Sequence, residues 1–262
     1  MSTTIATWNV NSLRVRMPQL TEWLGANALD VIALQETKST DADFPLQGVE
    51  ALGFQVAFSG QKTYNGVATL SKAPLLDVVT AIPGFADEQK RILAATTGGV
   101  RVVNVYVPNG QATGSEKYTY KLGWLSALEG FLKEEIARHD QLLLLGDFNI
   151  APEDRDVHDP AAWADSVLVS APERAALGRL TSLGLTDVFR LFDQPAKAFS
   201  WWDYRQGAYR RNHGLRIDLI LATPILAAKC RSCSIDREPR AWERPSDHAP
   251  CKASFDISAS GA

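Results

Sequence analysis

The clearest candidates for chemistry lie in residues 141–152, QLLLLGDFNIAP, where a carboxylate and a carboxamide follow an apolar run. Four consecutive leucines, 142–145, are too few for a membrane span and are typical of a strand buried on both faces. Because side chains alternate along a strand, we expect Asp147 and Asn149 to point the same way and Phe148 to point into the protein. The pattern predicts a carboxylate and an amide held side by side at the mouth of a rigid sheet, an arrangement that orients a metal-assisted nucleophile.

Further polar residues stand where other apolar runs end, and sheet proteins commonly gather catalytic groups there. These residues are Asn9, Glu36, Tyr106, Asp218, Asp247 and His248. Taken singly, most have an ordinary explanation, since an Asn or Asp after a strand is commonly a turn former and a lone Glu suits a solvated loop. Asp218 is different, because it interrupts an apolar strand and a buried carboxylate needs a partner. His248 is the histidine best placed to be that partner.

Composition describes the setting of these residues. The chain has 262 residues and 45% hydrophobic composition, and no Gly/Ser/Pro-rich linker or charge block divides it. We therefore expect a single domain over residues 1–262. The net charge of −3 argues against a surface coated in positive charge for general nucleic-acid binding. It leaves room for a DNA enzyme with a local basic strip.

Compartment signals in the sequence are few. No apolar run approaches the ~20 residues needed to cross a bilayer, and the N-terminus lacks the pattern of a secretory signal. Three cysteines, Cys230, Cys233 and Cys251, suit a reducing environment. We expect a cytoplasmic protein that does not enter a membrane, and a monomer by default. The Cys230–Cys233 spacing resembles half a zinc site, but no second pair accompanies it, so buried thiols are the expectation.

Strand and helix patterns alternate along the chain, which predicts an α/β protein with mixed sheets. Gly98 and Gly99 suit a tight turn between two strands. The predicted helices cover residues 16–26, 115–138 and 172–183. The predicted strands cover residues 4–10, 30–34, 54–59, 66–71, 92–97, 100–107, 142–145, 217–222 and 251–257.

A basic and aromatic segment covers residues 199–216, FSWWDYRQGAYRRNHGLR. Arginines mixed with tryptophans and tyrosines suit phosphate contacts together with stacking at a damaged nucleotide. The alternative is a solvated loop whose tryptophans fill the core. Four arginines carry the first interpretation: Arg205, Arg210, Arg211 and Arg216.

Seven motifs occur together in one order: WNVNSLR, LQETK, NGVA, YVPNG, LLGDFNIAP, GLRID and RPSDHAP. In this set and order the chain resembles the exonuclease III family of AP endonucleases, over about residues 4–257. The resemblance implies a four-layer α/β sandwich, with two mixed sheets packed face to face and helices outside. It also implies divalent-metal hydrolysis of a DNA phosphodiester.

Residue by residue, the resemblance implies a metal site and a water-activating group. Glu36 matches the family's main metal-ligand carboxylate, Asn9 lies beside it, and Asp247 matches a second acidic residue near the metal. Asp147 matches the residue that orients or deprotonates the attacking water, and Asn149 the residue that holds the phosphate and that aspartate. Carboxylate and carboxamide oxygens suit Mg²⁺ or Mn²⁺ rather than Zn²⁺.

The resemblance also implies phosphate and DNA contacts. His248 matches the phosphate-contacting histidine, with Asp218 as its orienting partner. Tyr106 matches an active-site tyrosine that contacts phosphate or helps the water. The candidate DNA-binding residues are Arg91 at a position resembling a DNA-contacting arginine, Trp202 and Leu215 at pocket-wall positions, Trp242 near them, and the segment's Arg205, Arg210 and Arg211.

The implied substrate is double-stranded DNA with abasic sites or blocked 3′ ends. The motifs leave open whether incision 5′ to abasic sites, 3′→5′ exonuclease or 3′-phosphatase activity dominates, because residues 154–177 carry no motif with assignable chemistry. Two other functions remain. One is a phosphoesterase of the same fold acting on a small or lipid phosphoester. The other is a catalytically silent nucleic-acid-binding member of the family.

Overall fold

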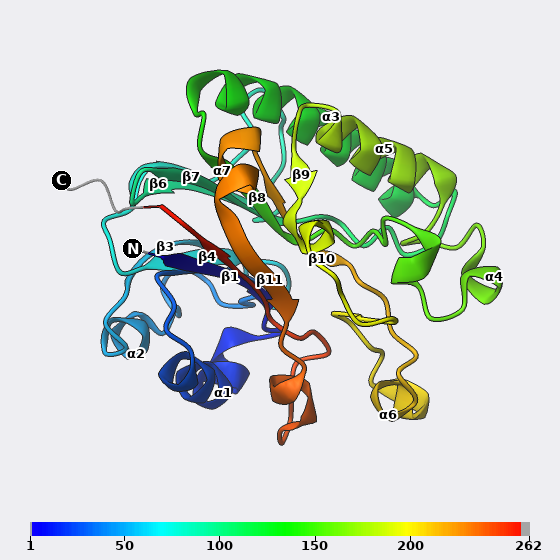
Figure 1. The fold of residues 1–262 in the computed structure, drawn as a ribbon, viewed down its shortest axis with the longest axis horizontal. Coiled ribbons are helices and arrows are strands. Elements are labelled where there is room, and N and C mark those ends of the chain that lie inside the picture. Colours follow the sequence, from blue (N-terminus) through cyan, green and yellow to red (C-terminus); the bar gives the residue numbers. More distant parts are fainter. Residues whose placement is uncertain (1, 258–262) are drawn as a thin grey trace.

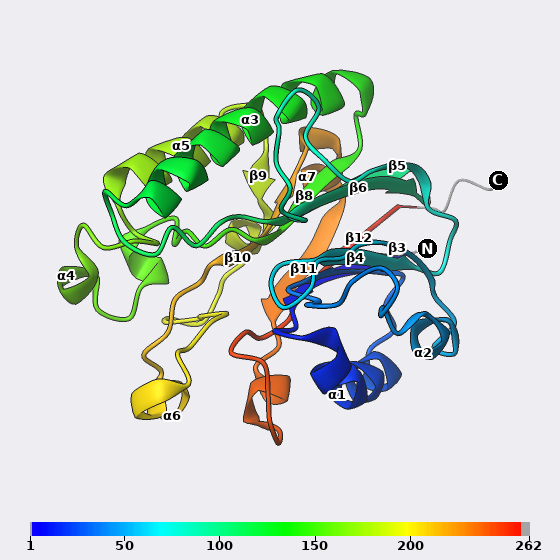
Figure 2. The same cartoon turned by 180° about the vertical axis from the view of Figure 1, so that it is seen from behind.

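Two six-stranded mixed sheets lie face to face in the computed structural model, which describes residues 2–257 (Figures 1 and 2). Helices cover the outer face of each sheet, so the expected four-layer α/β sandwich is confirmed. The short helices α4 (Pro160–Trp163) and α6 (Ala208–Arg211) lie at the end of the sandwich away from the start of the first strand (Figure 1).

The first sheet has the strand order β11-β12-β1-β2-β4-β3. Strands β1 and β2 are parallel and are joined by α1 (Leu13–Ala26), and all other neighbours are antiparallel. Helix α1 packs on the outer face together with α2 (Leu46–Glu50). The strands are β1 (Thr3–Asn9), β2 (Val31–Gln35), β3 (Gln55–Ser59), β4 (Val67–Ser71), β11 (Cys230–Ile235) and β12 (Cys251–Phe255).

The second sheet has the strand order β5-β6-β7-β8-β10-β9. Its parallel pair is β7 and β8, joined by α3 (Glu116–Arg138), and α5 (Ala171–Thr181) lies beside α3. Helix α7 (Pro224–Lys229) follows the strand β10. The strands are β5 (Leu76–Val79), β6 (Ile92–Thr97), β7 (Val100–Tyr106), β8 (Leu142–Asp147), β9 (Thr186–Asp187) and β10 (Asp218–Ala222).

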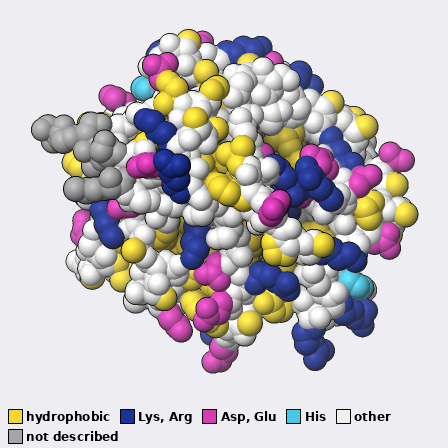
Figure 3. Space-filling view, in the orientation of Figure 1, with side chains coloured by type: hydrophobic (Ala, Val, Ile, Leu, Met, Phe, Trp, Pro, Cys, Tyr) yellow, Lys and Arg dark blue, Asp and Glu magenta, His cyan; other side chains and the backbone are white. Residues whose placement is uncertain are grey.

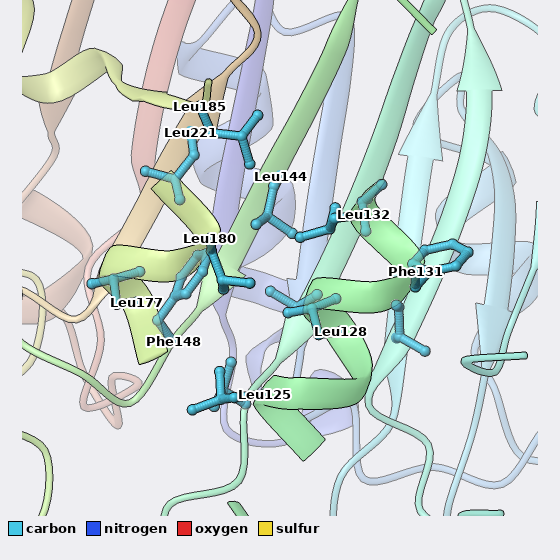
Figure 4. Close-up of a cluster of buried hydrophobic side chains, with 14 of the residues drawn as sticks. Leu125, Leu128, Phe131, Leu132, Leu144, Phe148, Leu177, Leu180, Leu185 and Leu221 are labelled. Carbon is cyan, nitrogen blue, oxygen red and sulfur yellow. The ribbon is translucent and has the colours of Figure 1, made fainter. Parts of the chain in front are cut away.

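The leucine run of β8 divides between two cores, as a strand buried on both faces must. Leu142 and Leu144 pack under α3 and α5, where Figure 4 shows leucines of both helices around Leu144. Leu143 and Leu145 point the other way, into the core between the two sheets. A third core lies between the first sheet and α1. Strand β8 is therefore held rigidly from both sides.

Gly146 joins the leucine run to Asp147 in a conformation that other residues rarely adopt, with φ 145°. A Cβ at this position would lie 1.9 Å from the carbonyl oxygen of Val105 on β7. The glycine therefore lets β7 and β8 pair up to their ends, where Tyr106 lies opposite Asp147.

Strands β5, β9 and β11 escaped sequence analysis, and each is an edge strand of its sheet. Strand β5 is mostly exposed and pairs irregularly with β6, β9 is very short, and β11 exposes half of its residues. An edge strand packed on one side only carries a weak apolar pattern. The three cysteines are free thiols. Within residues 2–257, no helix combines the length and apolarity that a membrane span requires.

Candidate active site

Polar side chains from both sheets meet at one end of the space between the sheets, where Glu36 and Tyr106 are partly exposed. Tyr106, Asp147 and Asp218 lie directly opposite one another on the neighbouring strands β7, β8 and β10. Side chains at every second position share a face, so Asp147 points the same way as Leu145, toward the first sheet. Asn9 ends β1 and faces the same space. The apolar core between the sheets thus ends in a ring of polar groups.

Asn9 connects the two candidate acidic groups. Its Nδ2 donates to Glu36 Oε1 at 2.8 Å and to Asp147 Oδ2 at 2.9 Å. Glu36 directly follows β2 with φ 52°, and a left-handed backbone at a glutamate is uncommon. Burial alone raises the pKa of Glu36, but Lys38 and the Asn9 amide outweigh burial and the net pKa is lowered. Lys38 Nζ lies 2.9 Å from Glu36 Oε2.

Asp147 and Asn149 lie side by side, as the sequence predicts, but strand alternation is not the reason. Strand β8 ends at Asp147, and Asn149 adopts a left-handed conformation with φ 48°. This turn brings the Asn149 backbone N–H to Asp147 Oδ1 at 2.9 Å and its Nδ2 to Asp147 Oδ2 at 3.4 Å. Phe148 points into the core under α3 and α5, as expected. Burial raises the pKa of Asp147, chiefly because water cannot reach its charge.

His248 and Asp218 form a buried pair beside Asp147. Nδ1 of His248 lies 2.9 Å from Asp218 Oδ2, and Nε2 lies 3.7 Å from Asp147 Oδ2. The Ser200 hydroxyl also donates to Asp218 Oδ2, at 2.7 Å. Burial alone lowers the pKa of His248, but the charges of Asp218 and Asp147 outweigh it and raise the pKa to about 10. The imidazole is therefore protonated at neutral pH and can donate from both nitrogens.

Tyr106 closes the site beside Arg91. Its pKa is raised well above the ordinary value, first by burial and then by the charges of Glu36 and Asp147, so its hydroxyl keeps its proton. The Arg91 guanidinium lies 4.7 Å from the Tyr106 ring centroid and donates to the Tyr106 carbonyl. Arg91 is 9% exposed, so only a small part of it can reach a ligand directly. A groove of about 580 Å³ begins beside these two residues and is lined further out by Tyr64 and Lys117.

Asp247 lies at the rim rather than in the central group. Its carboxylate accepts from Asn11 Nδ2 at 2.8 Å and from Trp201 Nε1 at 3.0 Å. Asn11 in turn accepts from Lys38, which pairs with Glu36. Asp247 is therefore joined to Glu36 through two intermediate side chains.

The donor atoms at the centre fit a hard divalent cation. In the part of the chain that the structure describes, one group of acidic and histidine side chains has ligand atoms close enough to share an ion, namely Glu36, Asp147 and His248, all within 4.8 Å of one another. The Asn9 Nδ2 faces both carboxylates as a donor, and Asn9 Oδ1 accepts from the Asn11 backbone N–H, so the ligand atoms at the centre are carboxylate oxygens. Oxygen ligands of this kind suit Mg²⁺ and Mn²⁺. A cation there would offset the buried charge of Asp147, whose pKa is raised chiefly by burial.

The predicted DNA-binding residues separate into exposed and buried groups. Arg205, Arg210 and Arg211 are exposed around α6, where Figure 3 shows Lys and Arg side chains gathered at one corner of the molecule. Trp202 and Leu215 are fully buried, Trp202 against Phe199 and Leu215 against Leu168 and Val157. Trp242 is half-buried and packs against the core under α1, apart from Trp202.

Arg216, also expected among the DNA contacts, is buried and pairs with Asp156 and Asp187. Its guanidinium joins the 3-10 helix Asp154–Asp156 to the short strand β9. Trp201 is the half-buried tryptophan of the segment, and its backbone pairs with both Leu215 and His248. The tryptophan next to the site is therefore Trp201 and not Trp202.

The sequence did not point to several residues of the site, although most of them lie inside the seven motifs. Asn11 and Lys38 belong to WNVNSLR and LQETK. Asn109, which donates to Asn149, belongs to YVPNG, and Ser246, which donates to the Asn9 carbonyl, belongs to RPSDHAP. Beneath the site, a buried polar layer links the two sheets: Gln35 Nε2 donates to Thr7 and to Asn104. No local pattern marks this layer, because its partners come from different sheets.

Comparisons with known proteins show the family of the chain. The model of the Endonuclease/Exonuclease/phosphatase family matches residues 6–248. The chain is 38% identical to exodeoxyribonuclease III of Haemophilus influenzae, over 95% of this chain and 98% of that protein. It is 32% identical to an exodeoxyribonuclease of Bacillus subtilis, over 97% of this chain and 99% of that protein.

Among solved structures, the chain matches a 3′ phosphatase from Neisseria bound to a product DNA hairpin, with 46% identity and a TM-score of 0.96. That match covers 97% of this chain and 100% of the other. An AP endonuclease from Archaeoglobus fulgidus matches with 39% identity and a TM-score of 0.94, at the same coverage. The chain belongs to the endonuclease/exonuclease/phosphatase family, in the group of exodeoxyribonuclease III and the AP endonucleases.

Proposed function

We propose that this protein is a divalent-metal-dependent DNA repair phosphodiesterase that hydrolyses phosphate esters at 3′ ends and incises the backbone 5′ to abasic sites. The observation that carries the proposal is the meeting of Glu36, Asp147 and His248 at one mouth between the sheets. Relatives of the same fold and full length include an exodeoxyribonuclease III and a 3′ phosphatase seen with product DNA.

Asp147 is the proposed activator of the attacking water. Its raised pKa brings a carboxylate closer to the acidity that suits a general base at neutral pH. The two Asn149 N–H groups hold both carboxylate oxygens in place, so the carboxylate presents one fixed face to a water molecule. General base catalysis of this kind typically contributes ~10²–10⁴-fold.

His248 is the proposed phosphate clamp. One ring nitrogen is occupied by Asp218. The other, Nε2, lies 3.7 Å from Asp147 Oδ2, too far for a hydrogen bond, and is the proposed donor to a nonbridging phosphate oxygen. Charge-assisted donation of this kind strengthens as negative charge builds on phosphorus. Tyr106, with its proton retained, supplies a second donor on the opposite side of Asp147.

Glu36 is the proposed carboxylate ligand of Mg²⁺ or Mn²⁺, with Asn9 beside it. When bound, such an ion would polarise the phosphate and stabilise the leaving oxygen. Asn9 contributes before any ion binds, because its amide donates to both carboxylates and holds Glu36 and Asp147 close together. Asp247 is the proposed outer carboxylate, reached through Asn11 and Lys38.

DNA is the proposed substrate because basic and aromatic groups flank the site on two sides. Exposed Arg205, Arg210 and Arg211 lie on one side, and the groove with Tyr64 and Lys117 adjoins the other. A duplex lying across the mouth meets both, which a small phosphoester cannot do. A catalytically silent DNA-binding protein does not need the buried group in which His248 lies between Asp147 and Asp218.

One assay separates these functions. Three duplexes, carrying an abasic site, a 3′-phosphate and an undamaged 3′ end, are incubated with the protein in Mg²⁺ and, in parallel, in chelator. We expect metal-dependent cleavage of the first two, faster than hydrolysis of a small phosphodiester such as bis-p-nitrophenyl phosphate. Binding without cleavage indicates the silent member, and preference for the small ester indicates the other phosphoesterase.

A further inference from the structure

Lys121 of α3 has no exposed surface, and its ammonium group lies under the turn that carries Asn149. Nζ donates to the Asn149 carbonyl at 2.7 Å and to the Asn109 carbonyl at 3.1 Å, and it pairs with Glu173 of α5. Neither the hydrolysis nor the DNA contacts described above use this group. A buried ammonium must form bonds to all its protons to be tolerated, and here three acceptors provide them.

The two carbonyls that Lys121 binds belong to the two loops that shape the water site. Asn149 holds Asp147 through its backbone N–H and side chain, and Asn109 Nδ2 donates to Asn149 Oδ1 at 3.1 Å. Asn149 has a left-handed backbone, which an L residue keeps only when its surroundings hold it there. The ammonium group of Lys121 donates a hydrogen bond to the carbonyl of Asn149.

Glu173 holds Lys121 and, as the third residue of α5, also completes the capping box at the start of that helix. It accepts from the backbone N–H groups of Leu168 and Ser170, and the Ser170 hydroxyl donates to it. Burial lowers the pKa of Lys121, and the charges of Glu173 and Asp147 oppose that shift. The pair is thus anchored by α3 and α5, both packed on β8, and reaches the water site through main-chain carbonyls alone.

We propose that Lys121, held by Glu173, is a positioning residue for hydrolysis: it fixes the Asn109 and Asn149 backbones so that Asp147 keeps its catalytic orientation. The inference rests on the proposed function, since it concerns the same reaction. Lys121 touches neither substrate nor metal ligand side chains. Its replacement therefore slows the chemical step while leaving DNA affinity in place.

A purely structural ion pair is the competing explanation, and the chain contains a matched control. Arg101 of β7 and Glu135 of α3 form a second buried pair, with Nε and Oε2 2.5 Å apart and side chains 2% and 4% exposed. Arg101 stands near the start of β7, at the other end of that strand from Tyr106. Breaking either pair takes the buried cationic partner from a buried carboxylate and destabilises the fold. Only the Lys121 pair reaches the water site.

The test compares Lys121→Met with Arg101→Met, and it adds Lys121→Met/Glu173→Gln, which leaves no unpaired buried charge if the single variant folds poorly. Single-turnover cleavage of a 3′-phosphate duplex is measured with saturating enzyme and Mg²⁺, well below each variant's Tm. DNA affinity is measured by fluorescence anisotropy in chelator.

We expect both Lys121 variants to cleave roughly 10–100-fold more slowly than wild type, the range typical of residues that orient metal-site groups. Their Kd for DNA stays within about twofold of wild type. Arg101→Met lowers Tm but cleaves at the wild-type rate. Wild-type cleavage by the double variant, or equal slowing by Arg101→Met, overturns the positioning role. Absence of cleavage by the wild-type protein instead overturns the proposed function itself.

Discussion

Nδ1 of His248 lies 2.9 Å from Oδ2 of Asp218, although the two residues are 30 positions apart and belong to segments of different sheets. Asp218 begins β10 of the second sheet, and His248 precedes β12 of the first. The pair therefore forms only when the sheets are packed together. It also sets the direction of the imidazole, because one nitrogen is committed to Asp218 and the other is aimed at Asp147.

Removing either member of this pair is expected to slow hydrolysis. His248→Gln deletes the charged donor, and we expect a loss of ~10²–10³-fold in the single-turnover rate, as for other donors to a developing oxyanion. Asp218→Asn keeps the shape but not the charge, so its loss should be smaller than that of His248→Gln. Rapid-quench assays on a 3′-phosphate duplex measure both rates. A larger loss in Asp218→Asn would contradict the assigned roles.

The same pair makes stability depend on pH in a defined direction. The folded pKa of His248 is raised to about 10, above its ordinary 6.5. A group with a raised folded pKa contributes stability that is full below the unfolded pKa and is lost as pH rises through the folded value. The free energy of unfolding of wild type minus that of His248→Gln should therefore decline between about pH 6.5 and 10. Urea unfolding in chelator measures this difference at each pH. A difference that grows as pH rises would contradict a raised pKa of His248 in the folded protein.

Asp147→Asn tests the water-activating role. The amide cannot accept a proton, so we expect cleavage to fall by at least ~10²–10⁴-fold. DNA binding should remain, because Asp147 is buried and the exposed groups proposed to contact DNA are unchanged. Cleavage assays and anisotropy are run on the same preparation. Near-normal turnover would remove Asp147 from the mechanism.

The exposed arginines around α6 are expected to bind DNA phosphates. Replacing Arg205, Arg210 and Arg211 with Ala should weaken DNA binding and flatten its dependence on salt, by roughly 0.9 in log–log slope for each phosphate that is no longer neutralised. Titrations at several NaCl concentrations measure the slope. The control removes three exposed cations on the helical face of the second sheet: Lys133, Arg138 and Arg179. An unchanged slope in the first variant would place the duplex elsewhere.

We expect replacement of Trp201 and replacement of Trp202 to affect stability and activity differently. Trp202 is fully buried, so Trp202→Ala should cost ~3–5 kcal/mol of stability. Trp201 is half-buried and bonded to Asp247, so Trp201→Ala should cost less stability and more activity. Urea unfolding and single-turnover rates together measure the contrast. The reverse order would restore Trp202 as the residue that serves the substrate.

Sequence alone determined most of the strands, their ends and most polar groups of the site. The leucines of β8 and the glycine before Asp147 are local signals, because burial on both faces and close strand pairing require those residue types where they stand. The ends of β1, β2 and β7 were therefore predicted to within one residue, with Asn9, Glu36 and Tyr106 at or just after them, whereas the predicted leucine strand stopped two residues short of Asp147, where β8 ends.

Tertiary structure decided which side chains face the site and which fill the core. Trp201 and Trp202 are alike in sequence, and only the packing of Phe199 and Ala249 around Trp202 distinguishes them. In the sequence, Arg216 resembles the other arginines of the basic segment. Only the structure shows that it is buried and pairs with Asp156 and Asp187. Lys121 resembles any other helical lysine in sequence, and the turn that it supports lies 28 residues away. Local pattern specifies where a strand ends, but the partners of a buried charge come from remote segments that meet only in the folded chain.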